Sequence, residues 1–215
     1  MARVDDPYLY FGNLGPQERQ YQIPNFIGLA LTPTHEREIA HNAATDPLPF
    51  ADGSVGKIQS QDVFEHIPFA RVGFVLDEIH RVLRPGGIFR LSVPDYRSPV
   101  LRRRSLFDHR GRVIGDLMMG ASAYYDPATA QARVRFAPGG DSHIWFPRYE
   151  TVLHLIVHSA IRHCDIRFWQ AWLDEDNYIC DPMPEDEMFV WRAFPHDPRS
   201  EGKPISIIAD FVKRP

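Results

Sequence analysis

The sequence predicts an α/β fold built around a mostly parallel β-sheet. The clearest indication is an amphipathic helix expected from about Arg71 to Leu83, whose apolar residues recur every three or four positions. Pro85-Gly86-Gly87 ends this helix, and the apolar run Ile88–Val93 that follows has the character of a strand. A helix, a tight glycine turn and an apolar strand form half of a βαβ crossover, which implies parallel pairing.

Short apolar runs predict further strands on both sides of this unit. They cover Tyr8–Phe11, Phe26–Leu31, Val55–Ser60, Ile166–Trp172 and Ile205–Val212. A second amphipathic helix is expected from Tyr149 to Ala160. Residues Glu36–Ala44 fit either a short helix or a strand, and the acidic, proline-containing stretch Asp174–Glu187 is expected to be a loop.

Length and composition favour one soluble domain over residues 1–215, with an insertion at about 96–147 that we expect to form a substrate lid. The formal net charge of −4 gives no reason to expect a nucleic-acid or membrane partner. No apolar stretch approaches the roughly 20 residues of a membrane-spanning helix. The polar start is unlike a signal peptide, and the two cysteines lack metal-site spacing. We therefore expect a cytoplasmic protein.

Three blocks in the first half of the chain carry the most specific signal. They read LPFADGSV at Leu48–Val55, SQDVFEHI at Ser60–Ile67 and HRVLRPGG at His80–Gly87. In this order and at this spacing they resemble the middle of class I S-adenosylmethionine-dependent methyltransferases of the type 11-like group. The resemblance implies a Rossmann-like, doubly wound, mostly parallel seven-stranded sheet with helices on both faces and an antiparallel last strand.

The same resemblance implies an enzyme that transfers a methyl group from S-adenosylmethionine to a small-molecule or sugar acceptor. In such a fold the cofactor lies in the crevice at the carboxyl ends of the parallel strands. The positions that match the family's cofactor site are Gly12, Asn13, Ala30, Asn42, Ser60, Gln61 and Asp62.

The cofactor-binding motifs depart from the family pattern at three positions. Leu14 stands in the first loop, where a small residue is expected. Ala30 takes the ribose position and has no acceptor, which costs about ten- to a hundredfold in affinity. Asn42 takes the adenine position, where its amide oxygen can still accept a hydrogen bond. These departures keep open an alternative, a catalytically inactive methyltransferase-like binding or partner subunit.

Two histidines are the candidate general bases for a methyl acceptor that must lose a proton. His143 lies in a glycine-rich loop beside two aromatic residues, and His66 follows a predicted helix start. A surface histidine is the alternative interpretation of His143. At the helix start, Asp62 and Glu65 have the spacing of a capping box.

Two further features allow a structural interpretation. Asp95 follows a predicted parallel strand, so it could face the crevice or cap the next turn. His154, His158 and His163 fall on or just after a helix without the carboxylate partner typical of zinc sites. The sequence therefore predicts no metal site.

Overall fold

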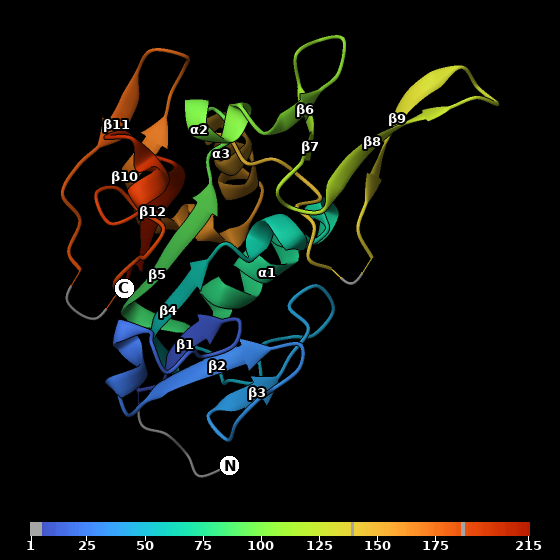
Figure 1. Ribbon diagram of the computed structural model, residues 1–215. Helices are drawn as coiled ribbons and strands as arrows, with labels where there is room; N and C mark the ends of the chain where they lie inside the picture. The colour runs from blue at the N-terminus through green and yellow to red at the C-terminus, as the bar shows by residue number, and fades with distance from the viewer. Residues whose placement is uncertain (1–5, 139, 186–187) are drawn as a thin grey trace.

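The computed structural model describes residues 6–138, 140–185 and 188–215. Its centre is an eight-stranded sheet. The strands are β1 (Tyr8–Phe11), β2 (Phe26–Ala30), β3 (Glu38–Ala40), β4 (Val55–Gln61), β5 (Leu83–Pro94), β10 (Cys164–Trp172), β11 (Tyr178–Cys180) and β12 (Ser206–Lys213). They are arranged in the order β11-β10-β12-β5-β4-β1-β2-β3 (Figure 1).

The pairing confirms a mostly parallel sheet with an antiparallel last strand. Strands β5, β4, β1, β2 and β3 pair in parallel, and β12 runs antiparallel between β5 and β10. The ambiguous stretch Glu36–Ala44 contains strand β3. The stretch expected to be a loop, Asp174–Glu187, contains β11, which adds an eighth strand to the expected seven. Residues 186 and 187 of that stretch lie outside the described residues.

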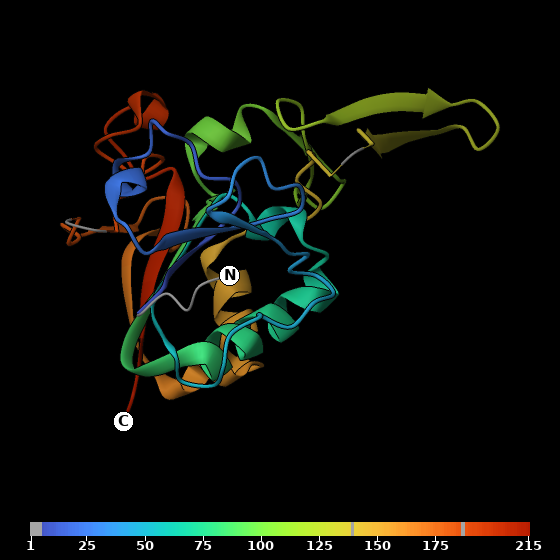
Figure 2. The ribbon, with the colours of Figure 1, turned by 90° about the horizontal axis from the view of Figure 1, so that it is seen from below.

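Helices α1 (Phe69–Val82) and α3 (Tyr149–Val157) both pack on one face of the sheet, rather than on opposite faces (Figure 2). Their buried apolar side chains share one core with the side chains of β1, β2, β4, β5 and β12 that point to this face. The alternation of side chains along each strand sends the other half of the sheet residues to the second face.

The second face is covered by a short 3-10 helix, η1 (Arg19–Gln22), and by the segment from Met188 to Ala193. The connections explain this departure from the expected arrangement. The β1–β2 connection contains Pro16 and Pro24, and the β2–β3 connection is short, because it consists of residues 31–37 alone. Proline inside a helix removes a backbone hydrogen bond and clashes with the preceding turn, so a long crossover helix does not form there.

Residues 96–147, expected to be an insertion, form short elements above the carboxyl end of β5. These are α2 (Pro99–Arg102), the hairpin of β6 (Ser105–Phe107) with β7 (Val113–Asp116), and the hairpin of β8 (Ala121–Asp126) with β9 (Gln131–Phe136). The β8–β9 hairpin projects away from the sheet in both views (Figures 1 and 2). Three further 3-10 helices are η2 (Phe64–His66), η3 (Ala160–His163) and η4 (Pro198–Ser200). None of the helices in the described part of the chain has the length and apolar character needed to cross a bilayer.

Candidate functional site

The carboxyl ends of β1 and β4 lie side by side, because Phe11 pairs with Ser60 in the parallel register. The chain turns sharply after each strand. Gly12 has a φ of +117°, and Asp62 has a φ of +49°, a left-handed conformation that is uncommon for a non-glycine residue. Two adjacent strand ends with such turns form the edge at which open α/β sheets bind ligands.

The end of β4 carries polar atoms that the described residues leave without a partner. The Ser60 hydroxyl and the Asp62 Oδ1 atom are buried and make no hydrogen bond to the described chain. Asp62 Oδ2 accepts a bond of 2.5 Å from Arg192, while Gln61 Oε1 accepts one of 2.9 Å from the Trp191 backbone N–H. Burial raises the pKa of Asp62, although the Arg192 guanidinium opposes that shift.

The first loop is held by an acid that is not among the predicted site residues. Glu38 on β3 accepts a 2.5 Å bond from the Leu14 backbone N–H and a 3.0 Å bond from the Asn13 side chain. Asn13 is exposed, whereas Leu14 is buried beside Tyr8 and other side chains of the second face. A single glutamate in a segment of ambiguous periodicity carries no signal for this role.

The positions predicted to hold the ribose and the adenine are both occupied by contacts within the chain. Ala30 is only 2% exposed, and its carbonyl accepts the backbone N–H of His41. The Asn42 amide oxygen accepts the backbone N–H of Ala44 at 3.0 Å, closing a turn on its own segment. That oxygen keeps a second lone pair, which can accept one further hydrogen bond.

The two histidines predicted as bases, His66 and His143, lie together, with ring centroids 4.8 Å apart. The Ile144 backbone N–H bonds the Glu65 carbonyl, and this contact fixes the loop of His143 against η2. The Glu65 side chain is fully buried between the histidines. Its Oε1 atom lies 3.4 Å from His143 Nε2 and 3.9 Å from His66 Nε2.

The capping box predicted for Asp62 and Glu65 is wrong. Val63 precedes the first turn of η2, and no side chain caps that turn. Neither carboxylate oxygen of Glu65 accepts a hydrogen bond from the described residues. Glu65 therefore points into the protein toward the histidines rather than back to the start of its own helix.

Hydrogen bonds hold the Nδ1 atom of each of the two histidines. His143 Nδ1 lies 2.5 Å from the Tyr96 hydroxyl, which donates at 2.6 Å to Asp116. Asp116 is fully buried and pairs with Arg104 at 2.8 Å. His66 Nδ1 lies 3.0 Å and 3.1 Å from the carbonyl oxygens of residues 142 and 140.

Burial disfavours the charged forms of both Glu65 and His143. It raises the pKa of Glu65 well above the usual range, and the nearby Asp62 carboxylate adds to that shift. Burial also lowers the pKa of His143 to about 3, and the nearby Arg104 guanidinium acts in the same direction. These shifts favour the protonated form of Glu65 and the neutral form of the His143 imidazole.

Asp95 does not face the crevice; it joins the ends of β5 and β10. It is fully buried, and its two oxygens accept the backbone N–H groups of Arg97 at 2.9 Å and Trp172 at 2.7 Å. Burial raises the pKa of Asp95 to about 7 in spite of these two bonds. The interpretation of Asp95 as a cap for the following turn agrees with this geometry.

This shift predicts a pH-dependent stability. The folded protein binds the Asp95 proton more tightly than the unfolded chain, so the stabilisation is complete below about pH 4 and is lost as the pH rises through about 7. Relative to Asp95→Asn, the free energy of unfolding of the wild type should fall by about 3 kcal/mol between about pH 5 and pH 8. Urea unfolding at both pH values measures this, with the exposed Asp165→Asn as control. A constant difference would mean that Asp95 stays ionised.

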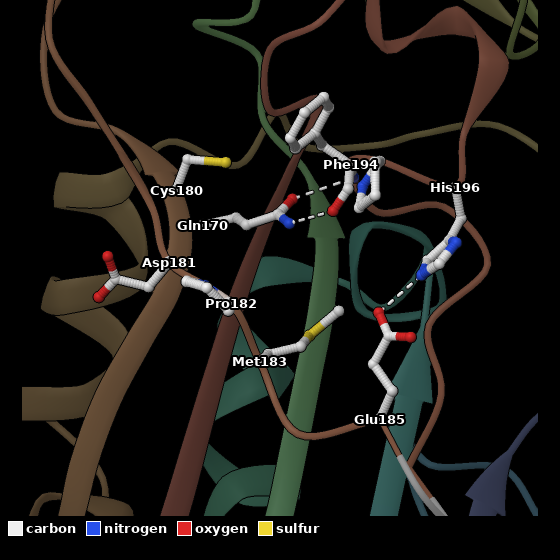
Figure 3. A pocket seen from close by; sticks show the side chains of 9 residues that line it. Gln170, Cys180, Asp181, Pro182, Met183, Glu185, Phe194 and His196 are labelled. Atoms are coloured by element: carbon white, nitrogen blue, oxygen red, sulfur yellow. Dashed lines mark hydrogen bonds and ion pairs between the residues drawn. The ribbon is translucent and has the colours of Figure 1, made fainter.

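Two cavities lie near the loop-covered parts of the molecule. A small one of about 30 Å³ is lined by Asp62, His143, Arg192 and Arg199, together with Leu101, Arg104 and Met119 from the insertion. A larger pocket of about 440 Å³ lies between Asp181–Glu185 and Phe194–His196 (Figure 3). Gln170 bonds the Phe194 backbone at its base, and the pair His196–Glu185, 2.6 Å apart, spans its opposite side (Figure 3). The two cavities have no lining residue in common, so the larger one is separate from the cavity beside Asp62.

Comparison with known proteins agrees with this architecture. Residues 23–91 match a family model described as a methyltransferase domain. A solved S-adenosylmethionine-dependent methyltransferase from Archaeoglobus fulgidus superposes with a TM-score of 0.50 at 11% identity, covering 97% of this chain and 87% of its own. The chain has the class I methyltransferase fold.

Two other solved structures are also similar. A methyltransferase from Mesorhizobium loti has 15% identity and a TM-score of 0.47, covering 98% of this chain and 94% of its own. The 1,6-didemethyltoxoflavin-N1-methyltransferase of Burkholderia thailandensis has 13% identity and a TM-score of 0.45, covering 97% and 72%. No curated protein matches the chain.

In this methyltransferase-fold protein, the segment that matches the family model contains some residues of the candidate site and leaves out others. It spans β2 to most of β5 and contains Asp62, Glu65 and His66. The first loop at Gly12 and the insertion loop at His143 lie outside it. The residues that complete the candidate site therefore come from segments that do not match the family model.

Proposed function

We propose that the protein is an S-adenosylmethionine-dependent methyltransferase whose cofactor contacts the ends of β1 and β4, at Gly12, Asn13, Ser60, Gln61 and Asp62. The observation that carries the proposal is the pair of unpartnered buried atoms, Ser60 Oγ and Asp62 Oδ1, at the end of β4. Buried polar atoms without partners are uncommon in folded proteins, and a bound ligand is one way to satisfy them. The Gly12 turn lies beside them at the end of the neighbouring strand.

The charges at this edge suit the amino-acid end of the cofactor. Arg192, about half exposed, can attract a carboxylate, and Asp62 can attract an ammonium group. Glu18 lies on the same side, where burial raises its pKa and Arg192 lowers it. Its Oε2 atom also lacks a partner among the described residues. Asp62 and Glu18 together with Arg192 thus offer opposite charges to the ammonium and carboxylate groups at the amino-acid end of the cofactor.

When bound, S-adenosylmethionine would supply an electrophilic methyl group, and the chain's task is to position an acceptor and exclude water. Leu101, Arg104 and Met119 of the insertion line the cavity beside Asp62, which supports a lid role for residues 96–147. The net charge of −4 favours a small-molecule or sugar acceptor over nucleic acid. The base role predicted for His143 and His66 has weaker support, because their Nε2 atoms point toward Glu65.

A second candidate function is a methyltransferase-like binding or partner subunit that does not methylate. The contacts around β2 and β3 favour it. Ala30 is buried, Glu38 is already bonded to the first loop, and Asn42 is bonded to its own turn. None of the three offers the free charged acceptor that two ribose hydroxyls require.

Calorimetric titration of the full chain with S-adenosylmethionine and its demethylated product tests the first proposal. We expect both to bind, and Asp62→Asn to weaken binding by about ten- to a hundredfold because a charged partner is lost. The matched control is Asp165→Asn, an exposed acid far along the chain that pairs with Arg214. Absence of binding by the wild type would favour the non-methylating subunit. Unchanged binding by Asp62→Asn would contradict the assigned contacts.

A further inference from the structure

Glu65, His66 and His143 bring three potential metal-ligating atoms to one point. One side-chain atom from each lies within 4.8 Å of the other two. Both oxygens of Glu65 and the Nε2 atom of His143 are buried without a hydrogen bond from the described residues. Leaving such atoms unsatisfied is costly, so their convergence requires an explanation.

The hydrogen-bond partners of the two Nδ1 atoms decide which nitrogen of each imidazole ring carries the proton. His66 Nδ1 faces two carbonyl oxygens, which only accept, so this nitrogen must be the donor. The Tyr96 hydroxyl has one proton, which it donates to Asp116. Tyr96 can therefore only accept from His143, and the His143 proton also lies on Nδ1.

With the proton on Nδ1, the neutral form of each imidazole directs an Nε2 lone pair toward the Glu65 carboxyl group. This is the arrangement of metal-binding histidines, in which Nδ1–H is held by a carbonyl or by a carboxylate network and Nε2 binds the cation. The Tyr96–Asp116–Arg104 chain and the two carbonyls of the insertion loop supply that outer layer.

We propose that Glu65, His66 and His143 form a binding site for a divalent transition-metal cation of the zinc type. Bonds of about 2.0–2.2 Å in a tetrahedral shell hold ligand atoms about 3.4 Å apart. Glu65 Oε1 and His143 Nε2 already have this separation, 3.4 Å. His66 Nε2 lies 3.9 Å from the same oxygen, and the three ligand atoms, all within 4.8 Å of one another, would move closer together on binding.

The donor set and the access path fit such a cation. Two imidazoles and one carboxylate suit zinc and related transition metals, whereas magnesium and calcium prefer oxygen ligands. His66 is 23% exposed, so the otherwise buried site has an entry. Three protein ligands leave a position for water or for an oxygen of another molecule. The proposal departs from the sequence expectation of no metal, and as ligands the histidines would not serve as bases.

Titration of the metal-stripped full chain with Zn²⁺, followed by calorimetry, tests the site. We expect one Zn²⁺ per chain, no comparable binding of Mg²⁺, and at least about a hundredfold loss of affinity in His143→Gln and Glu65→Gln. Tyr96→Phe should lose about ten- to a hundredfold, as is usual when an outer partner is removed. His109→Gln, a change of an exposed histidine, is the matched control.

A measurement on the wild type keeps the test valid if a buried variant fails to fold. Nitrogen-15 NMR of histidine-labelled protein should show two rings with the proton on Nδ1, whose Nε2 resonances shift on adding Zn²⁺. Equal Zn²⁺ affinity in the wild type and in folded His143→Gln would overturn the proposal. So would Nε2 resonances that ignore Zn²⁺, a result that would indicate a proton shared between Glu65 and His143 instead.

Discussion

Replacing Arg90 by methionine should lower the free energy of unfolding by about 3–5 kcal/mol. Arg90 on β5 is 1% exposed and forms two bonds of 2.7 Å to Asp210 on β12. Its remaining nitrogen donates to the backbone carbonyls of Pro184 and Met188, which belong to the covering of the second face. The methionine would leave a buried aspartate that keeps, among the described side chains, the Trp169 indole N–H as its donor.

Urea unfolding measures this loss, and two variants bracket it. The exposed pair Arg214–Asp165 is the control, where Arg214→Met should change stability by less than about 1 kcal/mol. The double variant Arg90→Met with Asp210→Leu should recover much of the loss, because replacing a whole buried ion pair by apolar groups is often near neutral. A loss below about 1 kcal/mol in Arg90→Met would contradict the assigned role of the pair.

Replacing Glu38 by glutamine should cost about 3 kcal/mol at neutral pH and loosen the first loop. Burial alone would raise the pKa of Glu38, but the backbone N–H groups of Thr34 and Leu14 and the side chains of Asn13 and Thr34 lower it to about 2. The stabilisation is therefore present above about pH 4.5 and is lost as the pH falls toward 2. Glutamine keeps one acceptor oxygen and turns its NH₂ group toward donors.

Urea unfolding and hydrogen exchange of the Leu14 amide measure the two effects. The neighbouring Glu36→Gln is the control, since Glu36 is exposed on the same segment. Protection of the Leu14 amide should fall in Glu38→Gln and stay unchanged in the control. Equal protection in both variants would mean that the packing of Leu14, rather than the Glu38 carboxylate, holds the first loop.

The sequence by itself determined the elements whose signal is local. The helix Phe69–Val82 follows from apolar residues at steps of three and four, and the apolar run Ile88–Val93 correctly predicts most of β5. The segment Pro85-Gly86-Gly87, expected to be a turn, lies within β5, which begins at Leu83. The three methyltransferase-like blocks indicate the fold because each is a short continuous stretch. The turn, strand or helix in each block depends on residues that are neighbours in the chain. Parallel pairing of β4 and β5 then follows from the crossover between them.

Only the tertiary structure decided how residues far apart in the chain are used. Glu65 has capping-box spacing, yet it faces His143, which the insertion loop brings from 78 positions away. In the sequence, Arg90 and Asp210 are each a charged residue within an apolar strand. Only the pairing of β5 with β12 shows that the two residues form an ion pair. Side-chain periodicity reports which face of an element is buried, but the partner on that face depends on strand order and connections. For this reason the sequence indicated the fold and the candidate residues, while the contacts that assign their roles required the structure.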